Sequence, residues 1–375
     1  MTGAFPYYYG DDVIALNNQA AKLLMRFTER GYSREEPSIL QPAEIFLDRS
    51  GEEIRRRTFT LSDPSGRELC LRPDLTIPIC KHAVDVKAQL PARLCYNGLA
   101  FRYQPNRPTR PVQFFQAGVE LLGEPDAAKG EAEILDLAFG AMKQAGLDDF
   151  EMRFGDLALF GALVDQLDLP AHWRARLKRH SWRPGYVETL LTRLGQGGAP
   201  APSRAQIVAR LDAVGNAPAA GRTREEIVER AMEQAAEAAS LKLDPAIAGA
   251  ITKLFGISGP ATGALAEIRA LLKAAGIKLD APLAAMDARL KTIAALGVDL
   301  SRVRFTAHFG RNMEYYTGFV FELWSKDAEG PVQVAGGGRY DTLMETLGAG
   351  KPVTAIGCAL RTERMLVARK FKGGA

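Results

Sequence analysis

The amino-acid sequence predicts an α+β fold, in which an antiparallel sheet is flanked by helices and carries a helical insertion. Three observations support this fold class: strand-like runs pair as hairpins in the first 155 residues, helical patterns dominate the middle of the chain, and strand-like runs return after residue 300. Runs of strands kept apart from runs of helices favour an α+β arrangement over a βαβ repeat. Residues 1–155 and 300–375 are therefore expected to form one core, with residues 156–299 inserted as helices.

The first expected element is an amphipathic helix in "DDVIALNNQAAKLLMRFTERGY". Apolar residues recur through it near helical spacing, Asp11 or Asp12 can cap its start, and Gly31 can end it. The next stretch, "SREEPSILQP", is expected to be extended because Pro37 interrupts any helix there.

Two hairpins are expected next. The runs "RTFTLSD" and "RELCLRP" flank a Pro-Ser-Gly turn, and the runs "RLCYNGLAFRY" and "VQFFQAGVELLG" are joined by the loop "QPNRPTRP". Strand-like runs separated by turn residues are typical of antiparallel pairs.

The middle and the end of the chain differ in character. Helices are expected in "REEIVERAMEQAAEAA", "ATGALAEIRALLKAAG" and "APLAAMDARLKTIAALG", which are rich in alanine, leucine and charged residues. Strands are expected in "RVRFTAHF", "MEYYTGFVFELW", "VQVAGG" and "VTAIGCAL", and a helix in "RTERMLVARKF".

Composition excludes several classes of protein. A net charge of +4 over 375 residues is too small to argue for nucleic acid as a partner. No apolar run approaches the roughly 20 residues of a membrane span, and no secretion signal is visible at the N-terminus. The four cysteines show no metal-ligand spacing and fit buried thiols in a reducing cytosol. The sequence therefore predicts a cytoplasmic protein with no metal and no cofactor.

Polar side chains recur on the expected strands and at one strand-to-helix junction. They are Asp74, Thr76, Arg102, Gln116, Glu120, Arg311, Tyr315 and Tyr316. Gln116 and Glu120 are four apart on one strand and therefore share a face. Carboxylates can hold an ammonium and arginine can clamp a carboxylate or phosphate, so the set suits a small zwitterion. The alternative is that alternating polar residues mark the solvent face of a sheet.

The stretch "VAGGGRYDTL" places three glycines before an arginine, a tyrosine and an aspartate. It matches neither a P-loop nor the glycine pattern that opens a Rossmann helix. Because glycine lets backbone approach a neighbour closely, we expect a turn or a close backbone crossing here and not a phosphate cradle.

Taken as an ordered set, several motifs resemble the catalytic core of histidyl-tRNA synthetase, a class II synthetase fold. They are "LRPDLT", "FRYQ", "QFFQAGVE", "RNMEYYTGFVFE", "GGGRYDTLMETLG" and "AIGCALRTERML". The first helix with the Pro37 segment resembles motif 1, the second hairpin resembles motif 2, and "GCALRTERM" resembles motif 3. The resemblance covers most of the chain outside its helical middle, and it implies a homodimer formed through the segment that resembles motif 1.

The resemblance also implies a histidine pocket. Its residues would be Asp74, Thr76, Arg102, Gln116, Glu120, Arg311, Tyr315, Tyr316 and Tyr340. In the family, the positions of Gln116 and Glu120 receive the amino group. Those of Tyr315 and Tyr316 hold the imidazole side, and that of Tyr340 lines the pocket. Arg364 stands at the place of the arginine that clamps ATP, as a possible remnant of a nucleotide site. The resemblance assigns no catalytic residue.

The sequence departs from the synthetase pattern in ways that affect function. Few residues follow Arg364, so no C-terminal anticodon-binding domain is expected. Gln104 stands where many bacterial synthetases carry an acid that helps to read adenine, and an Arg-Gly pair is changed to Arg311-Asn312.

This pattern resembles the synthetase paralogue that serves as the regulatory subunit of ATP phosphoribosyltransferase. The resemblance implies a non-catalytic protein that joins a short catalytic subunit, supports its activity, and brings feedback by L-histidine to the first step of histidine biosynthesis. One alternative is a histidine–tRNA ligase that lacks its anticodon-binding domain, because Arg311 and Arg364 could stabilise charge on a reacting phosphate. A weaker alternative is a stand-alone nucleotide or tRNA-like sensor.

Overall fold

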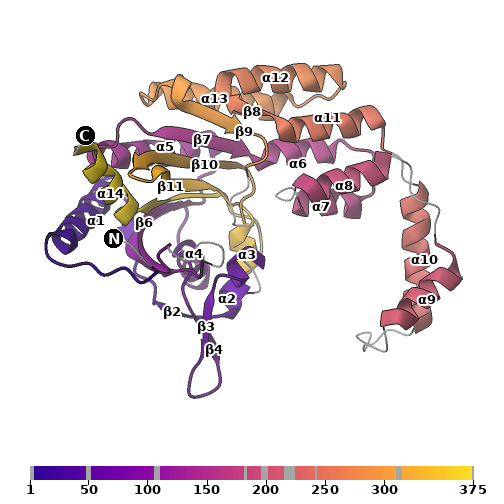
Figure 1. Ribbon diagram of the computed structural model, residues 1–375, viewed down its shortest axis with the longest axis horizontal. Coiled ribbons are helices and arrows are strands. Elements are labelled where there is room, and N and C mark those ends of the chain that lie inside the picture. The colour runs from indigo at the N-terminus through magenta and orange to yellow at the C-terminus, as the bar shows by residue number, and fades with distance from the viewer. Residues whose placement is uncertain are drawn as a thin grey trace. The chain divides into compact units, whose positions relative to one another are not determined.

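The computed structural model describes residues 4–47, 52–104, 110–180, 184–195, 202–214, 224–240, 243–309 and 315–373. The chain divides into two compact units. The larger one comprises Met1–Leu159, Ser258–Ala266 and Asp280–Ala375, and the smaller one comprises Phe160–Ile257 and Glu267–Leu279. Figure 1 follows the elements of both in chain order.

The larger unit is built on a nine-stranded sheet with the order β1-β5-β6-β12-β11-β10-β7-β9-β8. Its strands are β1 (Ser33–Arg34), β5 (Ala92–Phe101), β6 (Gln113–Leu122), β7 (Glu151–Asp156), β8 (Ser258–Pro260), β9 (Val303–Thr306), β10 (Phe319–Asp327), β11 (Gly330–Arg339) and β12 (Ala355–Arg361). All neighbours from β5 to β7 in this order pair antiparallel. The predicted α+β fold with a central antiparallel ladder is therefore confirmed.

The sheet differs from the prediction at both edges. The pairs β1·β5 and β7·β9 are parallel, so the sheet as a whole is mixed. The edge strand β8 comes from residues that were expected to be helical, and it pairs with β9. Because of this pairing, and because the helix after residue 280 is anchored to the sheet, both segments belong to the larger unit. The expected boundaries of the helical middle, 156 and 299, are corrected accordingly.

A second, three-stranded sheet contains the first predicted hairpin. Its strands are β2 (Leu40–Pro42), β3 (Phe59–Ser62) and β4 (Glu68–Leu71), in the order β2-β4-β3. The pairs β3·β4 and β2·β4 are both antiparallel. The Pro-Ser-Gly turn thus connects two strands as the sequence predicts.

Helices surround the two sheets of the larger unit. They are α1 (Asp11–Glu29), α2 (Glu44–Leu47), α3 (Glu52–Arg55), α4 (Thr76–Asp85), α5 (Ala127–Gln144), α13 (Asp280–Ala295), the 3₁₀ turn η1 (Leu300–Arg302), the π-helical turn η2 (Glu345–Ala349) and α14 (Thr362–Gly373). The first helix ends as predicted, with Gly31 in the left-handed region at φ 83°. Its start is corrected: Gly10 occupies the N-cap without a side-chain cap, and Asp11 lies in the first turn.

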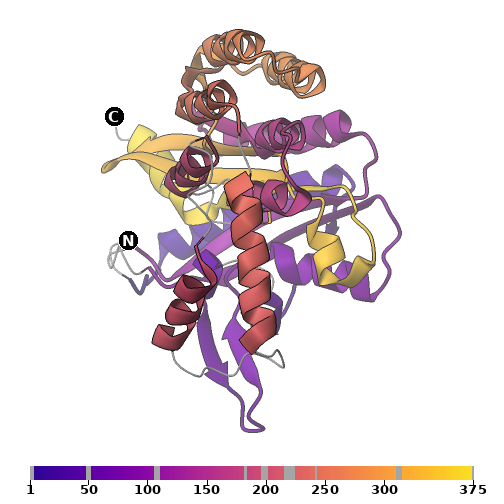
Figure 2. The ribbon, with the colours of Figure 1, turned by 90° about the vertical axis from the view of Figure 1, so that its right-hand side faces the viewer.

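The helices α1, α5 and α14 pack together and against the large sheet, as Figures 1 and 2 show. Strand alternation fixes which face they cover. Leu121 lies close to Gly130 of α5, so its neighbour Glu120 projects from the opposite face of β6. That opposite face is covered by a hydrophobic cluster that includes Ile77 and Cys80 of α4 and Leu347 of η2. Glu120 thus emerges within the covered interior of the unit.

The three glycines of "VAGGGRYDTL" lie within β11, between β10 and β12. A Cβ on Gly337 would overlap the backbone of Gly357, and a Cβ on Gly338 would overlap that of Phe319. The glycines therefore allow a close crossing of three strands, and they form a strand instead of a turn.

A buried charge cluster anchors α13 to the sheet. Arg289 donates from Nε to Glu131 Oε2 at 2.9 Å and from Nη1 to Asp156 Oδ2 at 3.1 Å. Its guanidinium also lies 4.2 Å from the ring centroid of Phe319, and Arg339 donates to the other oxygen of Glu131 at 3.3 Å. Burial raises the pKa of Asp156, and the charge of Arg289 opposes that rise. Each buried charge of the cluster thus has a partner, which offsets the cost of burying it.

The smaller unit is helical. Its helices are α7 (Ala171–Arg179), α8 (Pro184–Gly195), α9 (Arg204–Val214), α10 (Arg224–Ser240) and α11 (Pro245–Gly256), while α6 (Leu157–Asp165) and α12 (Ala261–Ala274) contribute residues to both units. The rings of Phe160 and Phe255 pack 4.8 Å apart between centroids, and Lys178 pairs with Asp165 at 2.6 Å. The alanine-rich patterns predicted to be helical are confirmed as α10, α12 and α13.

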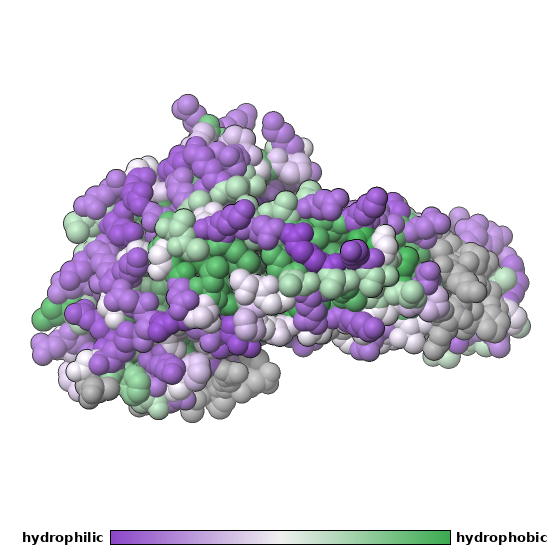
Figure 3. All heavy atoms as spheres, turned by 90° about the horizontal axis from the view of Figure 1, so that it is seen from above, coloured by the Kyte–Doolittle hydropathy of each residue, from purple (hydrophilic) through white to green (hydrophobic). Residues whose placement is uncertain are grey.

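The described part of the chain contains no helix that is both long and apolar enough to cross a membrane. On the face shown in Figure 3, hydrophilic residues are widespread and hydrophobic residues gather in patches between them. All four cysteines are buried and carry free thiols. The described residues include no group of three or more histidine, cysteine, aspartate or glutamate side chains that could hold a metal ion.

Candidate functional site

A small acidic cavity lies on the sheet of the larger unit, at the face that carries Glu120. Its lining residues are Asp74, Thr76, Arg102, Gln116, Glu120, Tyr315, Tyr316, Gly336, Tyr340, Gly357, Cys358, Ala359 and Arg361. Every described residue of the predicted histidine set is among them. Arg311 lies outside the described residues, and Arg364 lines a neighbouring cavity instead.

The junction between β4 and α4 places the first two of these residues. Thr76 is the first residue of α4, and Asp74 accepts a hydrogen bond at Oδ1 from the backbone N–H of Ile77 at 3.2 Å. An aspartate that accepts from the first turn of a helix is held by the unpaired N–H groups there. The start of the helix thus fixes both side chains at the cavity.

Glu120 is the centre of the acidic cavity. Its Oε1 accepts a hydrogen bond from Thr76 Oγ1 at 2.7 Å, and its Oε2 accepts from the Tyr340 hydroxyl. Burial raises the pKa of Glu120 from its ordinary 4.5 to about 7, although the two hydroxyl donors lower it in part. The side chain is only 1% exposed, so a cation that enters the cavity would favour its ionised form.

Two further acceptors in the cavity have no hydrogen-bond partner among the described residues. They are Asp74 Oδ2 and Gln116 Oε1, and both are buried. Gln116 Nε2 donates a hydrogen bond to Tyr96 Oη at 3.1 Å. Burial raises the pKa of Asp74, while the charge of Arg102 lowers it. Buried polar atoms are rarely left unpaired, so these oxygens point to a ligand that donates hydrogen bonds.

Glycine and tyrosine shape the rest of the cavity. A Cβ on Gly357 would overlap the carboxylate of Glu120, its cross-strand neighbour. The rings of Tyr315 and Tyr316 lie 4.9 Å apart between centroids, and those of Tyr315 and Tyr340 lie 5.6 Å apart. The cavity therefore has a floor without side chains and a wall of aromatic rings.

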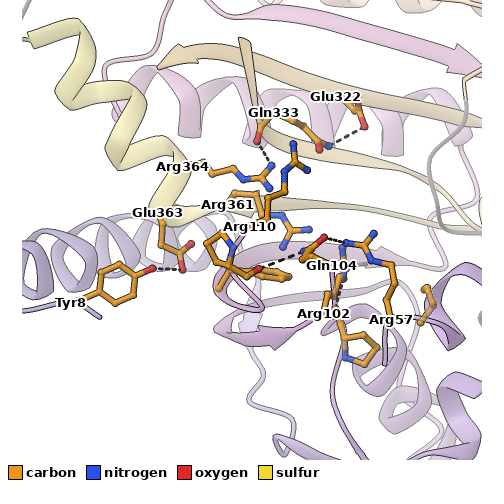
Figure 4. A pocket seen from close by; sticks show the side chains of 14 residues that line it. Tyr8, Arg57, Arg102, Gln104, Arg110, Glu322, Gln333, Arg361, Glu363 and Arg364 are labelled. Atoms are coloured by element: carbon orange, nitrogen blue, oxygen red, sulfur yellow. Dashed lines mark hydrogen bonds between the residues drawn. The ribbon is translucent and has the colours of Figure 1, made fainter. Parts of the chain in front are cut away.

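A second cavity, of about 230 Å³, adjoins the first and is rich in arginine. Its lining residues are Tyr8, Ile54, Arg57, Pro73, Arg102, Gln104, Arg110, Pro111, Phe114, Glu322, Gln333, Arg361, Glu363 and Arg364. Figure 4 shows the side chains of Arg110, Arg361 and Arg364 gathered at its centre. Arg102 and Arg361 line both cavities, so the acidic and the arginine-rich sites are contiguous.

The arginines of this cavity are positioned by backbone and rings. Arg364 donates to the Gln333 carbonyl at 3.0 Å, Arg102 donates to the Pro73 carbonyl at 2.7 Å, and Arg361 lies 4.0 Å above the Phe114 ring. Burial, together with the charges of nearby arginines, lowers the pKa of Arg364 to about 10. Like charges held together in this way favour an anionic ligand.

Gln104, which departs from the synthetase pattern, faces the same cavity. Its Oε1 accepts a hydrogen bond from Arg57 Nη2 at 2.5 Å, and its Nε2 donates to the Pro111 carbonyl at 3.5 Å. At the other side, Glu363 accepts a hydrogen bond from the backbone N–H of Phe115 and lies 3.5 Å from the Tyr8 hydroxyl. The amide of Gln104 thus occupies the position at which the resemblance to the synthetases led us to expect a carboxylate.

Several residues of the site were not predicted from the sequence. They are Arg57, Tyr96, Arg110, Glu322, Gln333, Arg361 and Glu363. Glu322, Arg361 and Glu363 lie within motifs that the sequence shows, but nothing in those motifs marks them as site residues. Only the fold brings all of these residues together.

A mostly antiparallel sheet that carries an acidic pocket beside an arginine pocket defines a class II synthetase-like core. The family model for histidyl-tRNA synthetase matches residues 10–211 and 203–365. A solved ATP phosphoribosyltransferase regulatory subunit/histidyl-tRNA synthetase from Bacillus halodurans superposes with a TM-score of 0.68 at 23% identity, covering 98% of this chain and 82% of that one. Histidyl-tRNA synthetase from S. aureus superposes with a TM-score of 0.54 at 20% identity, covering 99% of this chain and 73% of that one.

Proteins related in sequence identify the family within this class. An ATP phosphoribosyltransferase regulatory subunit from Chelativorans sp. (strain BNC1) is 36% identical over 94% of this chain and 98% of its own length. One from Allorhizobium ampelinum is 36% identical over 95% of this chain and 99% of its own length. The chain belongs to the family of ATP phosphoribosyltransferase regulatory subunits.

Proposed function

We propose that this chain is a non-catalytic subunit that joins a short catalytic ATP phosphoribosyltransferase subunit in the cytoplasm. It supports the activity of that subunit and binds L-histidine as the feedback signal for the first step of histidine biosynthesis. The names of its relatives support the proposed catalytic partner, and the acidic cavity supports histidine as the proposed ligand.

The assignment of the ligand rests on one observation: three residues with buried acceptor oxygens line the acidic cavity. Asp74 and Gln116 each present an oxygen without a partner in the described part of the chain, and the carboxylate of Glu120 lines the same cavity. An ammonium group has three N–H donors and a positive charge, so it satisfies all three acceptors at once. The α-ammonium of an amino acid is the ligand group that this chemistry favours.

The remaining groups of an amino acid also find partners. Arg102 and Arg361, at the boundary of the two cavities, suit its carboxylate. Tyr315, Tyr316 and Tyr340 offer rings and hydroxyls to a planar, polar side chain such as imidazole. We assign the predicted histidine set, Arg311 included by resemblance, to this ligand.

Histidine binding requires the acidic cavity to widen. Its volume of about 30 Å³ is the share of roughly one water molecule. Tyr315 and Tyr316 belong to a segment outside helices and strands, which makes them the side chains best able to move aside. Binding would therefore displace the rings of Tyr315 and Tyr316 from their present positions.

The arginine-rich cavity is the observation that favours the second candidate, a histidine–tRNA ligase. An anion site next to an amino-acid site is what adenylate formation requires, because cations must stabilise charge on the reacting phosphate. Arg364, the possible nucleotide remnant, lines that cavity. The two candidates differ in the reaction that the chain supports.

Two assays on one preparation separate these candidates. We expect formation of phosphoribosyl-ATP by a short catalytic subunit to rise strongly when this chain is added, and we expect no charging of histidine tRNA. Addition of histidine should then inhibit the mixture. Robust charging of tRNA without any effect on the transferase would reverse the assignment.

We further propose that two copies of this chain pair through residues 11–42, the segment that resembles motif 1. Apolar side chains are exposed along it, among them Ile14, Met25, Ile39 and Leu40. An isologous contact would cover the same patch on both copies. Light scattering on the chain alone should give twice its mass of 40.8 kDa, and a monomer at micromolar concentration would contradict this pairing.

A further inference from the structure

A third cavity, of about 220 Å³, lies between α1, α5 and α14. It is separate from both pockets described above, and these helices can be followed at the left of Figure 1. Its lining residues are Ala15, Asn18, Gln19, Lys22, Leu23, Ala141, Gln144, Ala145, Leu366 and Arg369. The cavity has room for several water molecules or one small organic molecule.

Gln19 gives this cavity an unmet hydrogen-bonding demand. The side chain is 8% exposed, and its Nε2 donates to the carbonyl of Thr362 at 2.6 Å. That bond fixes the amide, because a flipped amide would place oxygen against oxygen. Gln19 Oε1 is buried and has no hydrogen-bond partner within the residues that the structure describes. An acceptor in this position calls for a ligand that donates an N–H or O–H group.

The charge of the lining residues is the second property that the ligand of this cavity would have to match. Lys22 and Arg369 both line the cavity, and neither forms an ion pair or a hydrogen bond within the described part of the chain. No acidic side chain belongs to the lining, whose other polar members are Asn18 and Gln144. The cavity is thus cationic at its edge, and it favours an anion.

We propose that this cavity binds a small hydroxy- or amino-carboxylate. The carboxylate pairs with Lys22 and Arg369, and the neighbouring hydroxyl or ammonium donates to Gln19 Oε1. Both parts are needed, since a carboxylate alone would leave the buried oxygen unpaired.

The site is also linked to the arginine-rich cavity. Thr362, which accepts from Gln19, opens α14, and the next two residues, Glu363 and Arg364, line that cavity. A ligand that fixes Gln19 therefore stabilises the first turn of α14. The proposal stands on its own contacts and does not depend on histidine binding in the acidic cavity.

Calorimetric titration with glycolate tests the site, because glycolate has a hydroxyl and a carboxylate but no ammonium to enter the acidic cavity. We expect binding to the intact chain to weaken by about tenfold in Lys22→Met and in Arg369→Met, each of which removes a charge-assisted bond. Lys351→Met, on an exposed turn residue, is the matched control and should leave the affinity unchanged. Both test residues are exposed, so the variants should fold.

Acetate and inorganic phosphate complete the test. Acetate should bind more weakly than glycolate, and Gln19→Leu should abolish that difference. Absence of glycolate binding, equal binding of acetate, preferential binding of phosphate, or affinities that ignore Lys22→Met and Arg369→Met would overturn the proposal. The last result would place the anion among the arginines of the neighbouring cavity.

Discussion

Glu120→Gln should weaken the binding of histidine by about tenfold to more than a hundredfold, the effect of losing a charge-assisted contact of about 1.5–3 kcal/mol. The substitution keeps the shape of the side chain and its contact with Thr76, so it removes chiefly the charge. Calorimetry with L-histidine measures the change. Glu345→Gln, at an exposed glutamate of the same unit, is the control and should bind as the wild type does. Equal affinity in the wild type and Glu120→Gln would remove Glu120 from the site.

The same pair of proteins should differ in how stability depends on pH. Burial raises the pKa of Glu120 in the folded chain to about 7, above its ordinary 4.5. A raised pKa means that the folded state holds the proton more tightly, so this contribution is full below pH 4.5 and is lost as the pH rises through 7. The stability of the wild type relative to Glu120→Gln should therefore fall across this window. Histidine should oppose the fall, since its ammonium favours the ionised carboxylate.

Arg289→Met should lower the free energy of unfolding by about 3–5 kcal/mol, the cost of leaving buried charges without their partner. Glu131 and Asp156 would lose their hydrogen bonds to Arg289, whose own side chain is 6% exposed. Arg339 still reaches Glu131, so Asp156 would be the more strongly affected acid. Urea denaturation followed by circular dichroism measures the change.

Lys81→Met is the matched control for this substitution. Lys81 pairs with Asp85 on the surface of α4, and breaking an exposed pair of this kind costs about 0–1 kcal/mol. Arg289→Lys, which keeps a charge but loses the fixed fork of the guanidinium, should fall between the two. A loss below about 1 kcal/mol in Arg289→Met would show that the cluster does not hold α13 in place.

Period and spacing predicted the central ladder, and the resemblance to histidyl-tRNA synthetase added the set of residues that line the acidic cavity. Gln116 and Glu120 lie four residues apart on one strand, and the structure places both in the same cavity. The edges of the sheet could not be predicted in this way. The strand β8 has only three residues, and its sequence Ser-Gly-Pro gives no strand signal of its own. It exists because β9 offers it an edge to pair with.

The burial of charged side chains was the other feature that could not be predicted from the sequence. Arg289 lies in an alanine-rich helix where a charged residue usually faces solvent, and its burial follows only from the acids that α5 and β7 bring to it. The same holds for Arg57 and Arg110, which reach the arginine-rich cavity from segments without a periodic pattern. Contacts between residues far apart in the chain depend on the fold, so local secondary-structure propensity does not predict them.

The four buried cysteines have a practical consequence for locating the surface that would contact the proposed catalytic subunit. Burial raises the pKa of Cys70 and of Cys95 to about 11, so little of either thiol is ionised at neutral pH. Cys80 and Cys358 are likewise enclosed. The native thiols should therefore react slowly with a maleimide dye. A single cysteine introduced on the surface would then be labelled selectively, and the four native cysteines would not have to be removed first. Crosslinkers and distance probes can thus be moved across the exterior one position at a time.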